Sequence, residues 1–294
     1  MSASNHSQAD SAWTLLSLVT GGILLLATLF LLREQSPFVA FKANVTAPAA
    51  AAPQAVLQAD ELLIEPVIPD QLGPRHKLTY EQWVTLLRQE AKVAAAQQPD
   101  SLTVLVGDSI SLWFPPHLLP HQNVWLNQGI SGETSAGLLK RLNLLDQTQP
   151  KAIFVMIGIN DLIRGWEDTI ILANYRRILR YLGRAHPQAK IVAQSILPHS
   201  DEQASWEGRE RLVALPNSRI KKLNQAISAI ALETGAYYLD LYPLLTDLQG
   251  NLRADLTTDG LHLNPQGYLV WSAAMQLFSQ IELELTLGQI DDGQ

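Results

Sequence analysis

The sequence predicts an α/β fold, a doubly wound five-stranded parallel sheet preceded by a single N-terminal transmembrane helix. Three observations predict this fold. Short, almost continuously apolar runs alternate with segments whose apolar residues recur at helical spacing. Strands of this kind, separated by helices, are typical of a parallel sheet that is covered on both faces. The chain has 294 residues and is 47% hydrophobic, which is enough for one large core.

Composition excludes several classes of protein. The net charge is −7 and no run of Lys or Arg occurs, so we expect no nucleic-acid partner. The chain has no cysteine, which excludes disulfides, thiolate metal sites and a cysteine nucleophile. The absence of cysteine does not fix the cellular compartment.

The N-terminal region contains the uncharged run SAWTLLSLVTGGILLLATLFLL at 11–32. About 20 helical residues cross a hydrocarbon layer of about 30 Å, so this run favours a retained membrane anchor. A buried core helix and a cleaved signal peptide are the alternatives. A signal peptide has a basic start and a shorter apolar centre, whereas no Lys or Arg precedes this run.

The orientation of the anchor rests on weak signals. Arg33 and Lys42 follow the run, and the positive-inside rule would place the following domain in the cytoplasm. That rule has little weight for long translocated domains. The uncharged Ala/Pro-rich stretch at 43–59 suits a domain held off a membrane surface, so we expect a single-pass membrane protein with an extracytoplasmic domain. The expected organisation is an N-terminal tail at 1–12, a transmembrane anchor at 13–32, an Ala/Pro-rich linker at 33–76, an α/β domain at 77–285 and a C-terminal tail at 286–294.

The elements of the α/β domain follow in order. Thr79, with Gln82 three residues later, forms a capping-box pattern that predicts a helix start near Leu78. The expected strands are 102–107, 123–127, 152–158, 190–197 and 236–241. The expected later helices are 134–146, 171–185, 218–234 and 265–281.

Polar residues gather where the expected strands end. Ser109 follows the first strand, NQGISGETS (127–135) comes at the end of the second, and GIND (158–161) at the end of the third. Asp259 and His262 lie just before the last helix. Because ligands of such folds bind at the carboxyl ends of the strands, we expect these residues to converge.

This set of residues permits acyl transfer. A serine hydroxyl needs a base, and the base needs a group that fixes its tautomer. The spacing of Asp259 and His262 lets the carboxylate reach Nδ1, which leaves Nε2 for Ser109. The Gly132 N–H, the Asn160 amide and the Ser109 N–H can serve as oxyanion donors. Taken singly, each of these residues has a structural alternative as a helix cap or a turn residue.

Four blocks carry a resemblance to a known family. The blocks are GDS (107–109), NQGISGET (127–134), GIND (158–161) and DGLH (259–262). In this order, over residues 100 to 280, they resemble the SGNH (GDSL-type) hydrolase family. The resemblance implies a flavodoxin-like SGNH hydrolase sandwich. It also implies Ser109 as nucleophile, His262 as general base and Asp259 as its orienting acid, with Gly132, Asn160 and the Ser109 amide as oxyanion hole. The family usually acts on esters or thioesters without a metal or cofactor, so we expect no cofactor and no metal.

Other polar residues are weaker candidates. Ser111 lies deeper in the helix that follows the turn, and His117, His121, His186 and His199 are expected to be surface or loop residues. Trp113 and Phe114 are candidate substrate-binding residues of an acyl site, with core packing as the alternative. The long polar connection at 198–218 is expected to form a lid or a wall of the cleft.

The expected function is that of a membrane-tethered serine esterase of the lipase, lysophospholipase or acyl-esterase type. One alternative is a carbohydrate O-acetylesterase or acetyltransferase acting on an envelope polymer. The other is a catalytically idle, membrane-anchored binding domain. The expected partners are a small-molecule, lipid or glycan ester substrate and the membrane. The natural substrate and the oligomeric state stay open.

Overall fold

A single sheet of five parallel strands organises the part of the chain that the computed structural model describes, residues 78–283. The strand order is β2-β1-β3-β4-β5, which confirms the predicted α/β fold with a five-stranded parallel sheet. The strands are β1 (Leu102–Gly107), β2 (Val124–Gly129), β3 (Ala152–Met156), β4 (Lys190–Gln194) and β5 (Tyr237–Leu239).

The expected anchor at 13–32 lies outside the described residues, as do the tails and the linker. Within residues 78–283, no helix combines the length and the apolar character needed to cross a membrane.

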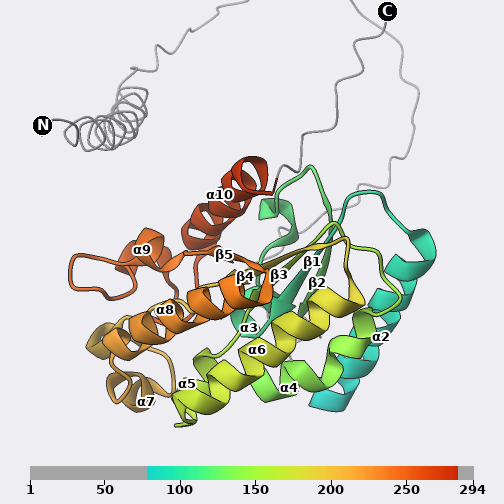
Figure 1. Cartoon of the computed structure of the whole chain (residues 1–294). Helices are drawn as coiled ribbons and strands as arrows, with labels where there is room; N and C mark the ends of the chain where they lie inside the picture. The colour runs from blue at the N-terminus through green and yellow to red at the C-terminus, as the bar shows by residue number, and fades with distance from the viewer. Residues whose placement is uncertain (1–77, 284–294) are drawn as a thin grey trace, which may run out of the picture. The chain divides into compact units, whose positions relative to one another are not determined.

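Helices cover both faces of the sheet. α6 packs against both α4 and α8 on one face, and α10 lies on the opposite side (Figure 1). The helices are α2 (Tyr80–Gln97), α3 (Ser109–Leu112), α4 (Ser135–Arg141), α5 (Ile159–Ile163), α6 (Asp168–Ala185), α7 (Arg209–Val213), α8 (Asn217–Thr234), α9 (Tyr242–Leu245) and α10 (Pro265–Ile281), with short 3-10 turns η2 (Pro116–Leu118), η3 (Leu142–Leu145), η4 (Asp201–Gln203) and η5 (Ala254–Leu256).

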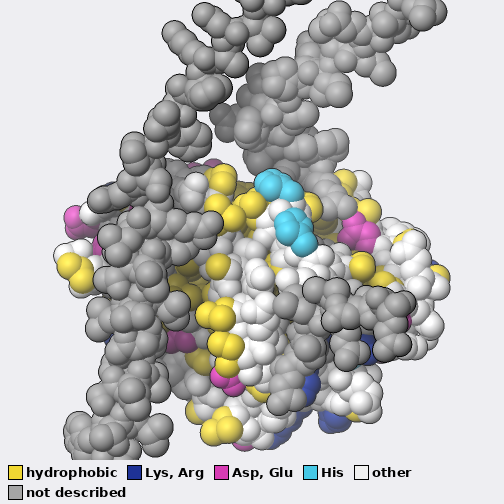
Figure 2. Space-filling model, turned by 90° about the horizontal axis from the view of Figure 1, so that it is seen from above, with side chains coloured by type: hydrophobic (Ala, Val, Ile, Leu, Met, Phe, Trp, Pro, Cys, Tyr) yellow, Lys and Arg dark blue, Asp and Glu magenta, His cyan; other side chains and the backbone are white. Residues whose placement is uncertain are grey.

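The outer face of α10 carries no charge. Leu269, Leu277 and Ile281 are exposed there, and the helix contains no Asp, Glu, Lys or Arg. Figure 2 looks down on the side of the domain that carries α10 and shows hydrophobic side chains on this surface, with Lys and Arg near its margin. The inner face of α10 buries Tyr268 and Trp271.

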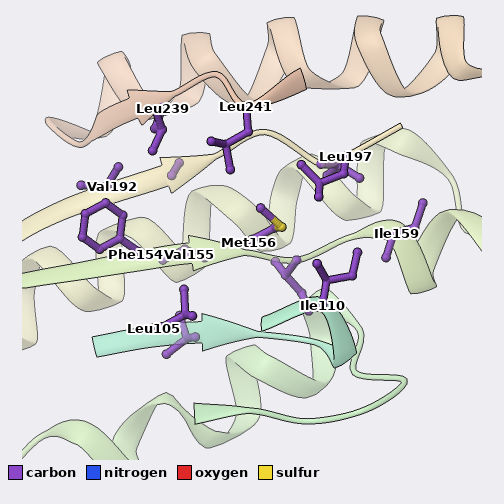
Figure 3. Packing of buried hydrophobic residues seen from close by; sticks show 14 of the residues in the cluster. Leu105, Ile110, Phe154, Val155, Met156, Ile159, Val192, Leu197, Leu239 and Leu241 are labelled. Atoms are coloured by element: carbon purple, nitrogen blue, oxygen red, sulfur yellow. The ribbon is translucent and has the colours of Figure 1, made fainter. Parts of the chain in front are cut away.

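The core forms where the strands are in register. Leu105 on β1 is level with Phe154 on β3, which is level with Val192 on β4. All three are buried, and Figure 3 shows their side chains within one cluster of apolar residues. Their continuous burial explains why these strands read as unbroken apolar runs rather than as alternating ones.

Element ends differ from the predicted ones for local reasons. β3 ends at Met156 rather than at 158, because Gly158 has φ +123° and turns the chain out of the sheet. β4 ends at Gln194, which pairs with Leu239, the last residue of β5. The expected helix at 134–146 is divided into α4 and the 3-10 turn η3.

Candidate active site

The turn after β1 presents Ser109 at the sheet edge. Ser109 is the first residue of α3, and the Asp108 carboxylate caps that helix by accepting the Ile110 N–H at 3.0 Å. The chain passes through a tight space here. A Cβ on Gly107 would lie 2.3 Å from the Met156 carbonyl oxygen, so only glycine fits.

A continuous hydrogen-bonded chain joins Ser109, His262 and Asp259. Ser109 Oγ lies 3.0 Å from His262 Nε2, and His262 Nδ1 lies 2.7 Å from Asp259 Oδ2. Asp259 Oδ1 also accepts the backbone N–H groups of Leu261 and His262, at 3.0 and 2.8 Å. The structure therefore brings together the three residues that the sequence singled out at positions far apart in the chain.

Burial and hydrogen bonds determine where the protons lie in the array of Ser109, His262 and Asp259. Burial raises the pKa of Asp259, but the hydrogen bonds from the side chain and backbone of His262 outweigh it and leave that pKa below its usual value. The carboxylate is thus ionised and can only accept hydrogen bonds. His262 Nδ1 must then carry the proton, which leaves Nε2 free to accept the proton of Ser109.

The connection at 198–218 supports the Asp259 turn. The backbone N–H groups of Ser205 and Trp206 both donate to the Asp259 carbonyl at 2.9 Å. The Ser200 N–H donates to the Gly260 carbonyl at 2.8 Å. This connection was expected to be a lid or a wall of the cleft, and its contacts show that it holds the turn carrying the acid.

The expected oxyanion donors start from neighbouring strand ends. Gly107 is in register with Gly129 of β2 and with Met156 of β3, so the loops carrying Gly132 and Asn160 leave the sheet at the level of Ser109. The Asn160 Nδ2 is buried and has no hydrogen-bond partner among the described residues. An unpaired buried amide donor is costly unless another acceptor is to occupy the site.

Three polar contacts hold these loops and were not predicted from the sequence. The Arg164 guanidinium donates to the Gly132 carbonyl at 2.7 Å. The Asp161 carboxylate accepts the N–H and the hydroxyl of Ser135, at 2.8 and 2.5 Å. The signal available in the sequence was the presence of charged residues inside or beside the motif blocks, among them the exposed Arg164 and the buried Asp161.

The third contact is a buried ion pair. Glu133 Oε2 lies 2.8 Å from Arg141 Nε, with both side chains almost fully buried. Arg141 also donates to the Gly107 carbonyl at 3.3 Å, so the pair links the loop that carries Gly132 and Glu133 to the end of β1. Burial raises the pKa of Glu133, and its bonds with Arg141 offset part of this effect.

The aromatic residues after the nucleophile have different surroundings. The Trp113 ring lies 4.1 Å from the His262 ring, centroid to centroid, at an interplanar angle of 36°. Phe114 is 2% exposed and packs 4.9 Å from the rings of Tyr268 and Trp271. The structure thus favours the core-packing alternative for Phe114.

Two of the other histidines lie in loops and are buried. His186 and His199 were expected to be surface or loop residues, and both lie outside helices and strands, with their side chains covered rather than at the surface. His199 is in a loop, where its Nε2 contacts the Leu215 carbonyl at 2.6 Å and its Nδ1 accepts the Asp201 N–H. These bonds occupy both ring nitrogens and make it a structural residue.

A cavity of about 1030 Å³ lies beside the edge strand β2. Its lining includes Trp113, Pro115, Leu119 and Trp125, together with residues of α2. Trp113 thus contacts the imidazole and also lines this cavity. In the range 78–283, no group of three or more His, Cys, Asp or Glu side chains is arranged to hold a metal ion.

The chain is similar to a known family and to several solved structures. A family model described as GDSL-like lipase/acylhydrolase matches residues 100–270. A solved structure from Streptococcus pneumonia, provisionally described as a platelet activating factor, is 26% identical with a TM-score of 0.62, covering 67% of this chain and 91% of its own. A GDSL-like lipase from Bacteroides thetaiotaomicron is 22% identical with a TM-score of 0.55, covering 67% and 98%, and shows the shared fold.

Curated relatives match over shorter stretches. An N-acylneuraminate cytidylyltransferase of Streptococcus agalactiae serotype V is 27% identical over 155 residues, which is 52% of this chain and 34% of the relative. An arylesterase of Vibrio mimicus is 32% identical over 102 residues, which is 30% of this chain and 51% of the relative. The matches span about a third to a half of the length of these relatives.

Proposed function

The chain belongs to the GDSL-like lipase/acylhydrolase family, and we propose that it is a serine esterase that hydrolyses carboxylic esters. One observation carries this proposal, the hydrogen-bonded chain from Ser109 through His262 to Asp259. Family membership supports the reaction class, and the geometry supports the assignment of roles.

Acylation begins at Ser109. As Oγ attacks the ester carbonyl carbon, His262 Nε2 accepts the hydroxyl proton, and Asp259 stabilises the imidazolium that forms. The imidazolium then donates this proton to the leaving alkoxide when the tetrahedral intermediate collapses. In deacylation, the same imidazole takes a proton from water as the water oxygen attacks the acyl carbonyl carbon. When this second tetrahedral intermediate collapses, the bond to Ser109 Oγ breaks, the imidazolium returns the proton to Oγ, and the carboxylic acid leaves.

The oxyanion of each tetrahedral intermediate requires donors already in position. We assign this role to the N–H groups of Ser109 and Gly132 and to the Asn160 amide. The unpartnered Asn160 Nδ2 supports this assignment, because an oxyanion would supply the acceptor that the described part of the protein lacks.

The first test compares the purified full-length chain with its Ser109→Ala variant on p-nitrophenyl esters from acetyl to palmitoyl. We expect hydrolysis by the wild type and a loss of at least about 10³-fold in kcat on removal of the nucleophile. A matched control is Ser111→Ala, which removes the neighbouring hydroxyl and is expected to retain activity. Equal rates for wild type and Ser109→Ala would contradict the proposal.

The chain-length profile separates two substrate classes. A preference for long chains would indicate a lipase or lysophospholipase. A preference for acetyl esters would favour a carbohydrate O-acetylesterase or acetyltransferase, a candidate supported by the partial match to an enzyme named for an N-acylated sugar. Failure of a fluorophosphonate probe to label Ser109 would instead favour the idle binding domain.

Membrane tethering is a separate part of the proposal. The uncharged run at 11–32 supports a single-pass anchor, and the Ala/Pro-rich linker supports a domain held away from the bilayer on its extracytoplasmic side. Protease added to intact cells should release a fragment that contains the α/β domain. Protection of the domain in intact cells, with digestion after lysis, would place it in the cytoplasm.

A further inference from the structure

The indole of Trp113 packs against the imidazole of His262, with the two ring planes tilted by 36°. Their ring centroids are 4.1 Å apart, closer than those of the Phe114–Tyr268 and Phe114–Trp271 pairs, which are both 4.9 Å apart. His262 is only 5% exposed. The imidazole is therefore held through its two nitrogens, by Ser109 and Asp259, and on its ring by Trp113.

Local helix geometry explains this contact. Trp113 is four residues after Ser109, and its N–H donates to the Ser109 carbonyl at 3.0 Å. Side chains four residues apart lie on the same face of a helix. One short turn of chain thus places both the nucleophile and the indole against the same imidazole.

The base of this turn is tied to the helix that follows His262. Phe114 packs against the rings of Tyr268 and Trp271 on α10, and the Tyr268 hydroxyl donates to the Ile110 carbonyl at 2.8 Å. These contacts fix α3 against α10. The position of the indole relative to His262 is consequently set by the buried core.

We propose that Trp113 is a positioning residue that holds the His262 ring and stabilises its imidazolium form during catalysis. This inference rests on the proposed esterase function. The face of an indole carries negative charge density and attracts a cation placed over it. The imidazole becomes a cation only after it has taken the Ser109 proton, so the interaction strengthens as the tetrahedral intermediate forms.

A competing role for Trp113 is contact with the acyl chain. Trp113 and Trp125 both line the cavity beside β2, but of these two only Trp113 packs against the His262 ring. Trp125 packs against Phe154 and donates its indole N–H to the Pro120 carbonyl. The same substitution at these two tryptophans therefore separates contact with the cavity from contact with the imidazole.

The experiment measures kcat and KM of the full-length chain on esters from acetyl to dodecanoyl, for wild type, Trp113→Leu, Trp113→Phe and Trp125→Leu. We expect Trp113→Leu to lower kcat by roughly two- to thirtyfold, by the same factor at every chain length, with KM little changed. Trp113→Phe keeps an aromatic face and should recover most of the loss. Trp125→Leu should keep the wild-type kcat.

A measurement independent of turnover accompanies the kinetics. Ring currents of an indole 4.1 Å from the His262 ring shift the imidazole C–H proton resonances, so Trp113→Leu should move them while Trp125→Leu leaves them in place. Matching melting temperatures of the variants exclude general unfolding.

The outcomes are distinguishable. An unchanged kcat in Trp113→Leu, or a KM increase confined to long esters, would overturn the inference and favour the acyl-contact role. Unmoved His262 resonances would also overturn it. A third outcome is that Trp113→Leu moves the His262 resonances as expected but the wild type hydrolyses no ester. This outcome would contradict the proposed function and would leave the ring contact established.

Discussion

At the scale of single residues, Asp259 controls which imidazole nitrogen carries the proton. Replacing it with Asn puts an amide opposite Nδ1, and this amide can donate a hydrogen bond where the carboxylate only accepts. The other tautomer, with its proton on Nε2, cannot accept the proton of Ser109. We expect Asp259→Asn to lower kcat by on the order of 10³- to 10⁴-fold with the fold intact.

The control for this prediction is Asp255→Asn. Asp255 is exposed and pairs with Arg253 at 2.6 Å, and neither residue contacts the imidazole. Measured on p-nitrophenyl acetate, the control should match wild type. A loss below tenfold in Asp259→Asn would refute the role assigned to the carboxylate.

Gly132 offers a second prediction at this scale. Its φ of +73° is unfavourable for other residues, while a Cβ would meet only Arg164 Nη2, at an ordinary 3.6 Å. Gly132→Ala should therefore cost about 1–2 kcal/mol of stability from backbone strain. It should also lower kcat by up to about 10²-fold, because relief of the strain rotates the oxyanion N–H.

Gly165→Ala is the matched control for backbone strain. Gly165 has φ +75° and open space around it, but it has no proposed role in the oxyanion hole. Both variants should lose similar stability in urea unfolding, and only Gly132→Ala should lose kcat. Equal kcat values for the two variants would show that the Gly132 N–H does not contribute.

At the scale of elements, the Glu133–Arg141 pair joins the loop that carries Gly132 to α4. Glu133→Gln leaves the Arg141 guanidinium buried without a counter-charge, which should cost about 3–5 kcal/mol of stability. Glu133→Gln combined with Arg141→Met removes both charges and should recover much of this loss. Urea unfolding measures all three chains.

The exposed Arg176–Glu233 pair provides the comparison. Glu233→Gln should leave the urea midpoint unchanged within error, because solvent screens such pairs. A similar loss in Glu233→Gln and Glu133→Gln would mean that burial of the inner pair does not determine its effect.

The sequence pattern predicted the sheet because strands that are buried on both faces consist mostly of apolar residues. β1 at 102–107 matches its prediction, since all of its residues are buried and most of its side chains are apolar. The break after Arg141 left no trace in the sequence, because the leucines of η3 fit a continuing α-helix equally well. Exact ends depend on how neighbouring strands pair, as at Gln194 and Leu239.

The candidate site divides in the same way. Ser109, Asp259 and His262 could be singled out because reactive residue types recur at strand ends in a recognisable order. The contacts of Arg164 with Gly132 and of Trp113 with His262 could not, because they join segments whose spacing in the sequence carries no periodic signal. They follow only from the docking of separate loops.

At the scale of the whole molecule, buried carboxylates couple stability to pH. Burial raises the pKa of Asp108 to about 7. The hydrogen bond from the Ile110 N–H lowers this pKa, and the negative charges of nearby Asp161 and Glu133 also raise it. Between its usual 3.8 and 7, the folded state holds a proton that the unfolded chain has released. The contribution of Asp108 to stability is therefore largest at low pH and is lost as pH rises through 7.

Asp108→Asn removes this titration and keeps an acceptor for the Ile110 N–H. The variant should gain stability relative to wild type between pH 5 and 8, on the order of a few kcal/mol. Melting temperatures across this range measure the difference. Groups whose pKa is lowered in the folded state, such as Asp259, make stability fall as pH falls. They are present in both chains, so their contributions to the difference cancel. Parallel curves for the two chains would contradict the burial argument.

Ser109 and His262 lie 153 positions apart in the chain, and the contacts that hold α3 against α10 come from residues beyond His262. A chain still emerging from the ribosome therefore has its nucleophile long before it has a base. The proposed active site is complete only when α10 has packed against α3. Ester hydrolysis by a partly synthesised chain is therefore not expected, because Ser109 lacks His262 until the C-terminal part of the domain has been made and has folded.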